Sequence, residues 1–513
     1  MSPLLEAVLN LGPQLAEHVL LCAAAVALGI AVALPLAVWS SRSATVAKVA
    51  LGFASLVQTI PALALLALFF PILLAARSIF GPDLPTLGFL PAWLALALYA
   101  LLPILRNAVT ALANLDDELI EAADGLGMTA WQKLRLVQAP LAAPFVMAGI
   151  RTASVWTIGA ATLATTIGQR SLGDPIFAGL QTQNWVLVLA GCIASAGLAL
   201  VADALFGMVE RGFATRRPGL VIAGAALALA GIAGAAASTV DWRGDGRENV
   251  VIGAKSFSEQ YILARAIGSV LEDAGYGVEY REGLGSAVVH NAVASSAIDI
   301  SVDYTGTLWT NTLERTDNPG RAAMYEKIVQ WEDANTGVRV LGRLGFENAY
   351  GLAVTQETAE RYGLSSIADL ASVAPQLTIG GDPEWFERPE WNAVRDAYGL
   401  SFGDQRTYSP TFMYNALLSG EADVISAYTS DGRIAARNLV VLSDPQEALP
   451  SYDAILLLSP RVAGDAALAD ALQPLLGAVD VETMREANYT VDRQDDKWSP
   501  ARAGQWLLDR IER

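Results

Sequence analysis

Long apolar runs that contain no acidic or basic residue, or only one, dominate the first half of the chain. A helix that crosses about 30 Å of hydrocarbon needs about 20 such residues. One run is interrupted by a single charge, Arg151, and the others contain none. The pattern predicts about six membrane-spanning helices, at Val19–Ser41, Val49–Ala76, Leu84–Leu105, Leu136–Gln169, Pro175–Ala202 and Pro218–Val240.

Basic residues in the short connections predict the orientation of these helices, because loops rich in Lys and Arg stay in the cytoplasm. Alternate connections are basic and hold Arg42 and Lys48, then Arg106, Lys133 and Arg135, then Arg211, Arg216 and Arg217. The opposing connections hold only Arg77 and Arg170, and the N-terminus, with Glu6 and Glu17, is not typical of a signal peptide. We therefore expect a multi-pass protein of the inner cell membrane, with everything after Val240 on the outer face.

The second half of the chain alternates strand and helix signals. Asn249–Ala254 is rich in Val and Ile, which is typical of a buried strand. Ser256 and Glu259 then fit a capping box, so we expect a helix that runs to about Ala274 and ends at Gly275. This alternation predicts an α/β domain with room for two lobes. Its other expected elements are a helix at Ser286–Ser296 and strands at Val278–Arg281, Ile298–Val302, Val338–Leu341, Tyr350–Val354, Leu377–Ile379, Val424–Ser426 and Val440–Leu442.

The composition indicates the same division into an apolar half and an acidic half. Hydrophobic residues make up 53% of the chain and charged residues 17%, yet the formal net charge is −18. An acidic chain without basic stripes argues against a nucleic-acid partner. Two cysteines, Cys22 and Cys192, and two distant histidines, His18 and His290, exclude a disulfide scaffold and a usual metal cluster. The sequence has no nucleophile elbow, phosphate loop or zinc motif, so we expect neither a cofactor nor catalysis.

The longest basic connection, residues 116–140, has the pattern of two short helices. Apolar residues recur at helical spacing in its first part, at Leu119, Ala122, Ala123 and Leu126. Gly125 or Gly127 is expected to end that helix, and a second helix is expected to run from Ala130 to Pro140. A helix–glycine–helix element on the cytoplasmic face can dock into a groove of a partner protein.

Arg151 has two interpretations. A charged residue inside a membrane span is a functional-site hypothesis by default. The alternative is that the span begins after Arg151, whose side chain then extends to the membrane surface or lies in the coupling region. The sequence favours this second, structural interpretation.

The connection at 116–140 carries the first family resemblance. Glu121-Ala122-Ala123, with Gly127, Val137 and Pro140 at the following offsets, resembles the coupling loop of ABC transporter permeases. Val137 and Ala139 depart mildly from the residues common there. Gln58–Pro61 and Leu101–Asn107 resemble the permeases of the glycine betaine/carnitine/choline uptake branch, and the resemblance covers residues 15–210. It implies a separate cytoplasmic ABC ATPase that receives this loop, and a homodimer of permeases.

The second half resembles the substrate-binding proteins of the same branch. The matching segments follow one another through the domain: Gly253–Gln260, Asp303–Thr307, Leu344–Tyr350, Trp385–Arg388, Ala427–Arg433 and Pro450–Asp453. The resemblance implies a permease domain at 1–217, a last membrane helix and linker at 218–247, and a two-lobed, periplasmic-binding-protein-like α/β domain at 248–513. Lobe 1 would hold residues 248–345 and 450–513, and lobe 2 residues 346–449, with crossings near Phe346 and Leu449.

The resemblance also implies a ligand site between the lobes. Its betaine-type members hold a quaternary ammonium in an aromatic box, and the matching tyrosines here are Tyr304, Tyr350, Tyr428 and Tyr452. A trimethylammonium has no N–H to donate, so ring faces are the chemistry that suits it. Lys255 and Arg388 match the positions expected near a betaine carboxylate, and Thr305 and Thr307 could donate hydrogen bonds to it.

Other polar and aromatic residues near these motifs have structural interpretations. Trp385 and Trp391 are expected to pack in the core or on the surface of a lobe. His290 lies in a predicted helix and is expected to have a structural role, and Asp431 is expected to form a local ion pair with Arg433. The function expected from the resemblance is import of a compatible solute such as glycine betaine. Choline, carnitine, ectoine or ergothioneine as cargo, a ligand-gated sensor or channel, and a membrane-tethered enzyme are the alternatives.

Overall fold

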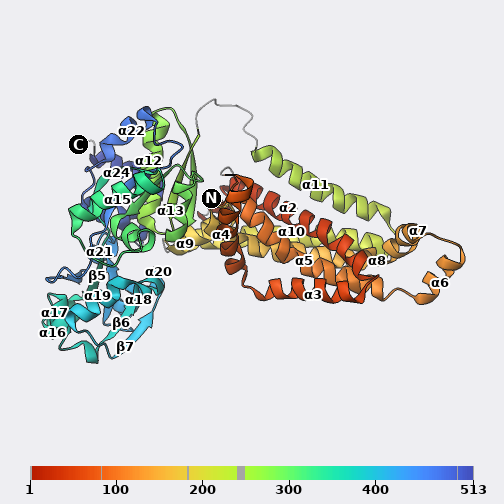
Figure 1. Cartoon of the computed structure of the whole chain (residues 1–513), viewed down its shortest axis with the longest axis horizontal. Helices are drawn as coiled ribbons and strands as arrows, with labels where there is room; N and C mark the ends of the chain where they lie inside the picture. Colours follow the sequence, from red (N-terminus) through yellow and green to blue (C-terminus); the bar gives the residue numbers. More distant parts are fainter. Residues whose placement is uncertain (1–2, 82–83, 182–183, 240–248, 494, 512–513) are drawn as a thin grey trace. The chain divides into compact units, whose positions relative to one another are not determined.

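A computed structural model describes residues 3–81, 84–181, 184–239, 249–493 and 495–511. The chain divides into two compact units (Figure 1), the first made of residues 1–177 and 185–245 and the second of residues 178–184 and 246–513. The first unit is helical and the second is an α/β unit.

Among the described residues of the first unit, six helical segments are long and apolar enough to cross a membrane, as the sequence predicted. They are α2 (Gly12–Ser40), α4 (Ala62–Phe80), α5 (Phe89–Ala113), the continuous segment Ala130–Ile167, α10 (Trp185–Ala214) and α11 (Pro218–Thr239). That continuous segment contains α7 (Ala130–Lys133), η1 (Leu134–Gln138), α8 (Ala139–Ala161) and η2 (Thr162–Ile167). Shorter helices are α1 (Pro3–Leu9), α3 (Ala44–Thr59), α6 (Asp117–Gly125) and α9 (Asp174–Gln181).

Two predicted spans have the wrong limits. The run Val49–Ala76 is not one helix, because α3 ends at Thr59 and α4 begins at Ala62. Ile60, which precedes Pro61, has extended dihedral angles of φ −75° and ψ 126°, since the proline ring disfavours helical geometry at the residue before it. The run Pro175–Ala202 likewise contains the end of α9 before α10 begins at Trp185.

Small residues bring the helices of the first unit into close contact. Helix α5 packs against α2, α3, α4 and α8 (Figure 1), and it is the most buried of the described helices that could cross a membrane. A Cβ atom on Gly149 of α8 would lie 2.9 Å from the carbonyl oxygen of Pro103 in α5. A Cβ atom on Gly29 of α2 would lie 3.2 Å from that of Ala100 in α5. Lipid offers no hydrophobic drive for helix association, so this close van der Waals packing holds such helices together.

The second unit contains two five-stranded sheets. The first sheet has the order β2-β1-β3-β10-β4, in which β1, β2 and β3 run parallel and β10 pairs antiparallel with both β3 and β4. Its strands are β1 (Asn249–Lys255), β2 (Gly277–Leu284), β3 (Ile300–Tyr304), β4 (Arg339–Glu347) and β10 (Asp453–Leu458). The second sheet has the order β7-β6-β8-β5-β9, with β5 (Tyr350–Thr355), β6 (Thr378–Gly381), β7 (Asp404–Thr407), β8 (Val424–Tyr428) and β9 (Leu439–Leu442).

The helices of this unit cover the two sheets (Figure 1). Between strands of the first sheet lie α12 (Ser258–Asp273), α13 (Ser286–Ala294), α14 (Thr305–Thr307), η3 (Leu308–Thr312) and α15 (Arg321–Asn335). Between strands of the second lie α16 (Gln356–Tyr362), α17 (Ile367–Leu370), η4 (Ala374–Gln376), α18 (Pro383–Glu387), α19 (Pro389–Tyr398), α20 (Pro410–Ser419) and α21 (Gly432–Ala436). After β10 follow α22 (Ala466–Leu472), η5 (Gln473–Leu475), α23 (Val481–Asp492) and α24 (Pro500–Ile511).

The chain passes between the two sheets at two places. It leaves the first sheet after Glu347 of β4 and enters the second at Tyr350 of β5. It leaves the second sheet after Leu442 of β9 and re-enters the first at Asp453 of β10. Both passages therefore bring residues from the ends of strands to the junction of the two lobes.

Arg151 lies inside α8, which begins at Ala139, so the helix itself does not start after this residue. Its Nε and Nη2 atoms donate to the carboxylate of Asp203 in α10 over 2.6 Å each, and its Nη1 atom donates to Glu210 over 3.2 Å. Gly207 of the same helix leaves space for the guanidinium, whose carbon would lie 3.5 Å from a Cβ atom there. The ion pairs therefore join α8 to α10 through charges that the membrane would otherwise disfavour.

This arrangement predicts that charge balance matters more than Arg151 itself. Arg151→Gln leaves two carboxylates uncompensated and should lower the melting temperature of the detergent-solubilised chain by about 3–5 °C. Combining it with Asp203→Asn should recover part of that loss, because one of the unpaired charges is gone. Size-exclusion profiles after heating measure both, and an additive loss in the double variant would contradict the account.

Candidate functional site between the two lobes

A cavity of about 310 Å³ lies between the lobes of the α/β unit, and all four predicted tyrosines line it. Tyr304 ends β3, Tyr350 begins β5, Tyr428 ends β8, and Tyr452 directly precedes β10. Tyr350 and Tyr428 are direct partners in the antiparallel pairing of β5 with β8, so their side chains lie next to each other. The strand ends at the two passages of the chain thus place the four phenols around one cavity.

Three of these rings form a cluster around Tyr350. The ring centroids of Tyr350 and Tyr428 are 5.2 Å apart, and those of Tyr350 and Tyr452 are 5.6 Å apart in an edge-to-face arrangement. Tyr304 lies apart from this cluster and stacks on Phe257 at 6.2 Å. Gly306 makes room for Tyr452, since a Cβ atom there would lie 2.5 Å from carbons of its ring.

The two candidate tryptophans belong to the packed interior, as expected. Trp385 is fully buried behind Tyr350, with 4.8 Å between ring centroids, and Trp391 follows at 5.9 Å from Trp385. The contact with Trp385 supports the ring of Tyr350, and the guanidinium carbon of Arg388 lies 5.4 Å from the centroid of the same ring.

Each of three tyrosine hydroxyls donates a hydrogen bond to a carboxylate. The hydroxyl of Tyr304 donates to Glu259 over 2.5 Å, that of Tyr428 to Asp382 over 2.9 Å, and that of Tyr452 to Glu390. Burial is the main cause that raises the pKa of all three phenols well above the usual value; the neighbouring carboxylates raise it further, and Arg388 opposes the shift at Tyr452. The tyrosines therefore stay protonated and act as donors at physiological pH.

The predicted cationic residues lie at the cavity, but each has an acidic partner. The Nζ atom of Lys255 donates to Asp303 over 2.5 Å, and both side chains are buried. Arg388 donates to both carboxylate oxygens of Glu390, at 3.2 and 3.3 Å, and to the hydroxyl of Tyr452 at 2.9 Å. Both cations are therefore largely neutralised before any ligand arrives.

Thr305 was expected to donate a hydrogen bond to the ligand, but its hydroxyl bonds the backbone instead. Its hydroxyl donates to the carbonyl oxygen of Ser451 and accepts from the backbone N–H of Asp453, each over 3.0 Å. These bonds hold the end of β3 to the start of β10, so the hydroxyl is used inside the protein. Thr307, two residues further along the chain, lines the cavity instead.

Glu259 is a site residue that the sequence analysis placed wrongly. The predicted capping box does not form, because α12 begins at Ser258 with Phe257 as its N-cap. The Glu259 carboxylate is buried and accepts from Asn348 over 3.2 Å, from Asn488 over 3.0 Å and from Tyr304. Burial raises the pKa of this carboxyl, while its hydrogen bonds oppose the shift.

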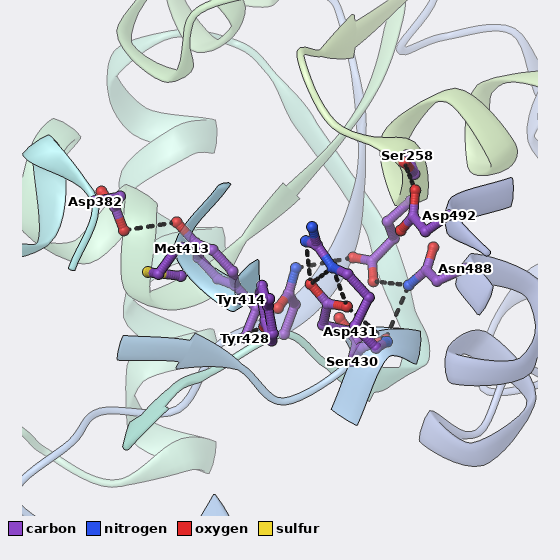
Figure 2. Close-up of polar contacts among 12 residues, drawn as sticks. Ser258, Asp382, Met413, Tyr414, Tyr428, Ser430, Asp431, Asn488 and Asp492 are labelled. Carbon is purple, nitrogen blue, oxygen red and sulfur yellow. Dashed lines mark hydrogen bonds and ion pairs between the residues drawn. The ribbon is translucent and has the colours of Figure 1, made fainter. Parts of the chain in front are cut away.

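A loop of the second lobe, Thr429–Arg433, is held by helix α23 of the first lobe (Figure 2). The amide of Asn488 donates to the carbonyl oxygen of Ser430 as well as to Glu259. Arg485 donates to the carbonyl oxygen of Thr429 over 2.6 Å. The predicted ion pair between Asp431 and Arg433 is confirmed, with 2.6 Å between its closest atoms.

Asp492 ends α23 beside this loop. It accepts a 2.5 Å hydrogen bond from the Ser258 hydroxyl (Figure 2), and burial raises its pKa to about 6 against the attraction of Arg433. Outside the cavity, His290 bonds Glu332 over 2.7 Å, in keeping with the structural role expected of it.

The connection at 116–140 belongs to the first unit. Helix α6 begins after Asp116, whose side chain accepts from the backbone N–H of Glu118, and includes Glu121, Ala122 and Ala123. Gly127 follows with a positive φ of 73°, and Thr129 caps α7. The second helix does not end at Pro140 as predicted, because that proline lies in the first turn of α8 and a first-turn proline needs no N–H partner. Leu126 and Trp131 point their apolar surface outward.

A two-lobed α/β domain with a cavity between its lobes, in one chain with six described helical segments that are long and apolar enough to cross a membrane, is the architecture of a membrane transport protein that carries its own binding domain. Residues 248–509 match the substrate binding domain of ABC-type glycine betaine transport systems, and residues 25–215 match the inner membrane component of binding-protein-dependent transport systems. The chain belongs to this transport family, with permease and substrate-binding domain fused.

Three relatives illustrate the two parts. The chain is 29% identical over 468 residues to the ergothioneine transport permease/ergothioneine binding protein of Helicobacter pylori (strain G27), which covers 88% of this chain and 82% of that protein. It is 42% identical over 195 residues to the glycine betaine/carnitine/choline transport system permease protein of Bacillus subtilis (strain 168), covering 38% and 84%. It is 31% identical over 264 residues to the carnitine transport binding protein of Listeria monocytogenes serotype 1/2a (strain 10403S), covering 48% and 83%.

The close contact between α21 of the second lobe and α23 of the first indicates that a larger residue there would keep the lobes apart. A Cβ atom on Gly432 would lie 2.4 Å from the backbone nitrogen of Tyr489 and 2.5 Å from the carbonyl oxygen of Arg485. Gly432→Ala should therefore prevent full closure and weaken ligand binding about 10–100-fold. Gly464→Ala is the matched control, because nothing lies within 4 Å of its Cβ position. Calorimetric titration measures both, and equal affinities for the two variants would contradict this role of Gly432.

Proposed function

We propose that the α/β domain captures a small quaternary-ammonium solute and delivers it to the permease domain for import. The observation that carries this proposal is the convergence of Tyr304, Tyr350, Tyr428 and Tyr452 on one cavity. A quaternary ammonium cannot donate an N–H hydrogen bond, so ring faces supply its attraction, roughly 0.5–2 kcal/mol each.

The charges at the cavity support a cationic ligand. Each of the three basic residues that line it is paired with an acid: Lys255 with Asp303, Arg388 with Glu390 and Arg433 with Asp431. Three further carboxyl groups line the cavity beyond these pairs, those of Glu259, Asp382 and Asp492. The surplus of acids favours a positive guest over a neutral or negative one.

Among quaternary ammonium compounds, the hydrogen-bonding groups favour one with a hydroxyl or N–H donor. The side-chain oxygens of Asn348 and Asn488 are buried at the cavity and have no hydrogen-bond partner within the described residues. Glu259 fixes both amides, because a carboxylate can take only their NH₂ groups. Choline has a hydroxyl that can donate a hydrogen bond to these oxygens. Glycine betaine has only a carboxylate, and the basic residues that could bind it, Lys255 and Arg388, are already paired with acids. Glycine betaine is therefore the second candidate.

Transport requires energy from a partner, and we place that partner at the connection 116–140. The residues of this connection that we expect to couple to the partner are Glu121, Ala122, Ala123, Gly127 and Pro140. Leu126 and Trp131 are exposed there and can make apolar contacts with the partner. An ABC ATPase that binds this connection would switch the permease from an outward-facing to an inward-facing conformation. A homodimer of this chain would form the transport pathway. The basic connections support an orientation with this element in the cytoplasm and the α/β domain on the outer face.

A ligand panel tests the proposed cargo. Calorimetry on the full chain in lipid nanodiscs should show choline binding about tenfold more tightly than glycine betaine, since a betaine leaves a carboxylate poorly matched. Carnitine, ectoine and ergothioneine complete the panel. If no quaternary ammonium compound binds, the proposal is wrong.

The same assay can distinguish two roles for Arg388, which are positioning other side chains of the site and binding the carboxylate of a ligand. Arg388→Met should weaken choline and glycine betaine alike, because Arg388 holds the Tyr452 hydroxyl and Glu390. Arg395→Met, on an exposed residue of α19, is the control and should change neither affinity. Loss of glycine betaine alone would instead assign Arg388 to the ligand carboxylate.

Reconstitution with the ATPase tests the coupling. Trp131→Ser should lower ligand-stimulated ATP hydrolysis about tenfold with little effect on folding, because Trp131 is exposed and an aromatic anchor dominates such interfaces. Uptake of choline into proteoliposomes should require ATP. Uptake that continues without ATP would identify a channel and contradict the importer.

A further inference from the structure

Three carboxylates stand behind the tyrosine rings of the cavity. Glu259, Asp382 and Glu390 each accept the hydroxyl hydrogen of a different phenol: Tyr304, Tyr428 and Tyr452 respectively. The acids come from three helical elements, α12, the N-cap of α18, and α19, so no single motif places them. A phenol hydroxyl that donates to a carboxylate thus occurs three times around one cavity, and the hydroxyls of Tyr304 and Tyr452 also accept hydrogen bonds, from Gln260 and Arg388.

Each acid is held in place by a second contact. Asp382 accepts the backbone N–H of Trp385 over 2.9 Å with its other oxygen, as the N-cap of α18. Glu390 is paired with Arg388, and Glu259 accepts from the amides of Asn348 and Asn488. Figure 2 shows the Tyr428 hydroxyl directed at Asp382. The three carboxyl groups are therefore fixed relative to the rings.

A carboxylate at the hydroxyl end of a phenol changes what the ring face attracts. The hydrogen bond moves electron density toward the oxygen and the ring, because hydrogen bonds in a low-dielectric interior polarise their members. The carboxylate charge adds a direct attraction for a cation on the ring face, within about 6 Å of the centroid. A neutral guest of the same shape gains neither effect.

We propose that Glu259, Asp382 and Glu390 set the charge selectivity of this cavity, by making the rings of Tyr304, Tyr428 and Tyr452 selective for a cation over its uncharged isostere. They are positioning and polarising residues that act through the phenols. The inference rests on the proposed binding of quaternary ammonium compounds and adds which residues make that binding depend on charge.

Asp382 is the acid that reports this effect with least disturbance. Glu390 is also the ion-pair partner of Arg388, and Glu259 joins segments of both lobes. Asp382→Asn removes the charge and retains an N-cap oxygen for Trp385, because Asn caps helices as well as Asp does. Asp396→Asn in α19 is the matched control, with the same change of net charge at an exposed position.

The test compares choline with its carbon isostere, the alcohol in which a tert-butyl group replaces the trimethylammonium. Calorimetry on the full chain in nanodiscs should show Asp382→Asn binding choline about tenfold more weakly and the isostere less than about twofold more weakly. Asp396→Asn should leave both affinities unchanged. An equal loss for choline and the isostere would mean that Asp382 only shapes the site, and would overturn the inference.

A second variant keeps the inference testable if Asp382→Asn fails to fold or the isostere binds too weakly to measure. Tyr428→Phe keeps the ring and removes the hydroxyl that links it to Asp382, so it should also weaken choline binding. In a double-mutant cycle, Asp382→Asn should cost less choline affinity in the Tyr428→Phe background than in the wild type. Unchanged choline binding by Tyr428→Phe would overturn the inference. A wild-type chain that binds no quaternary ammonium compound would instead overturn the proposed function itself.

Discussion

The buried carboxylate of Glu259 is the group on which the arrangement of the site depends. A carboxylate removed from water is costly unless hydrogen bonds replace its hydration. Here the donors are Tyr304 from the first sheet, Asn348 from the passage between the sheets, and Asn488 from α23. Asn488 also donates to the carbonyl oxygen of Ser430 in the second lobe. The hydrogen bonds that replace the hydration of Glu259 therefore also hold the two walls of the cavity together.

The basic residues at the cavity follow the same principle, because each buried charge has a partner that compensates it. Lys255, Arg388 and Arg433 carry their own acids, so none of them presents an unneutralised positive charge to the cavity. The rest of the cavity wall includes four phenol rings, three of which have a carboxylate at the hydroxyl. Such a wall attracts a cation through ring faces and long-range charge, and it requires no donor from the ammonium group. The permease unit uses the same device differently, where Arg151 joins α8 to α10 through Asp203 and Glu210.

The sequence predicted what periodicity and local signals determine. Apolar runs identified six crossing helices, and alternating strands and helices identified the α/β domain. The four tyrosines could be named because each sits in a short segment that resembles the substrate-binding proteins of a known family, and they do line one cavity. Pairing across long separations had no such signal. Glu259 looked like a helix cap because Ser256 precedes it by three residues, and only the folded chain brings Asn488 to it. Asp382 and Glu390 were likewise missed, since their tyrosine partners lie 46 and 62 residues away.

The central claim is that these phenols surround a quaternary ammonium between two lobes, and a structure with ligand tests it most directly. Cryo-electron microscopy of the full chain with choline should place the ligand nitrogen within about 6 Å of the ring centroids of at least three of Tyr304, Tyr350, Tyr428 and Tyr452. Ligand density outside this cavity, or a choline whose ammonium faces away from the rings, would contradict the account.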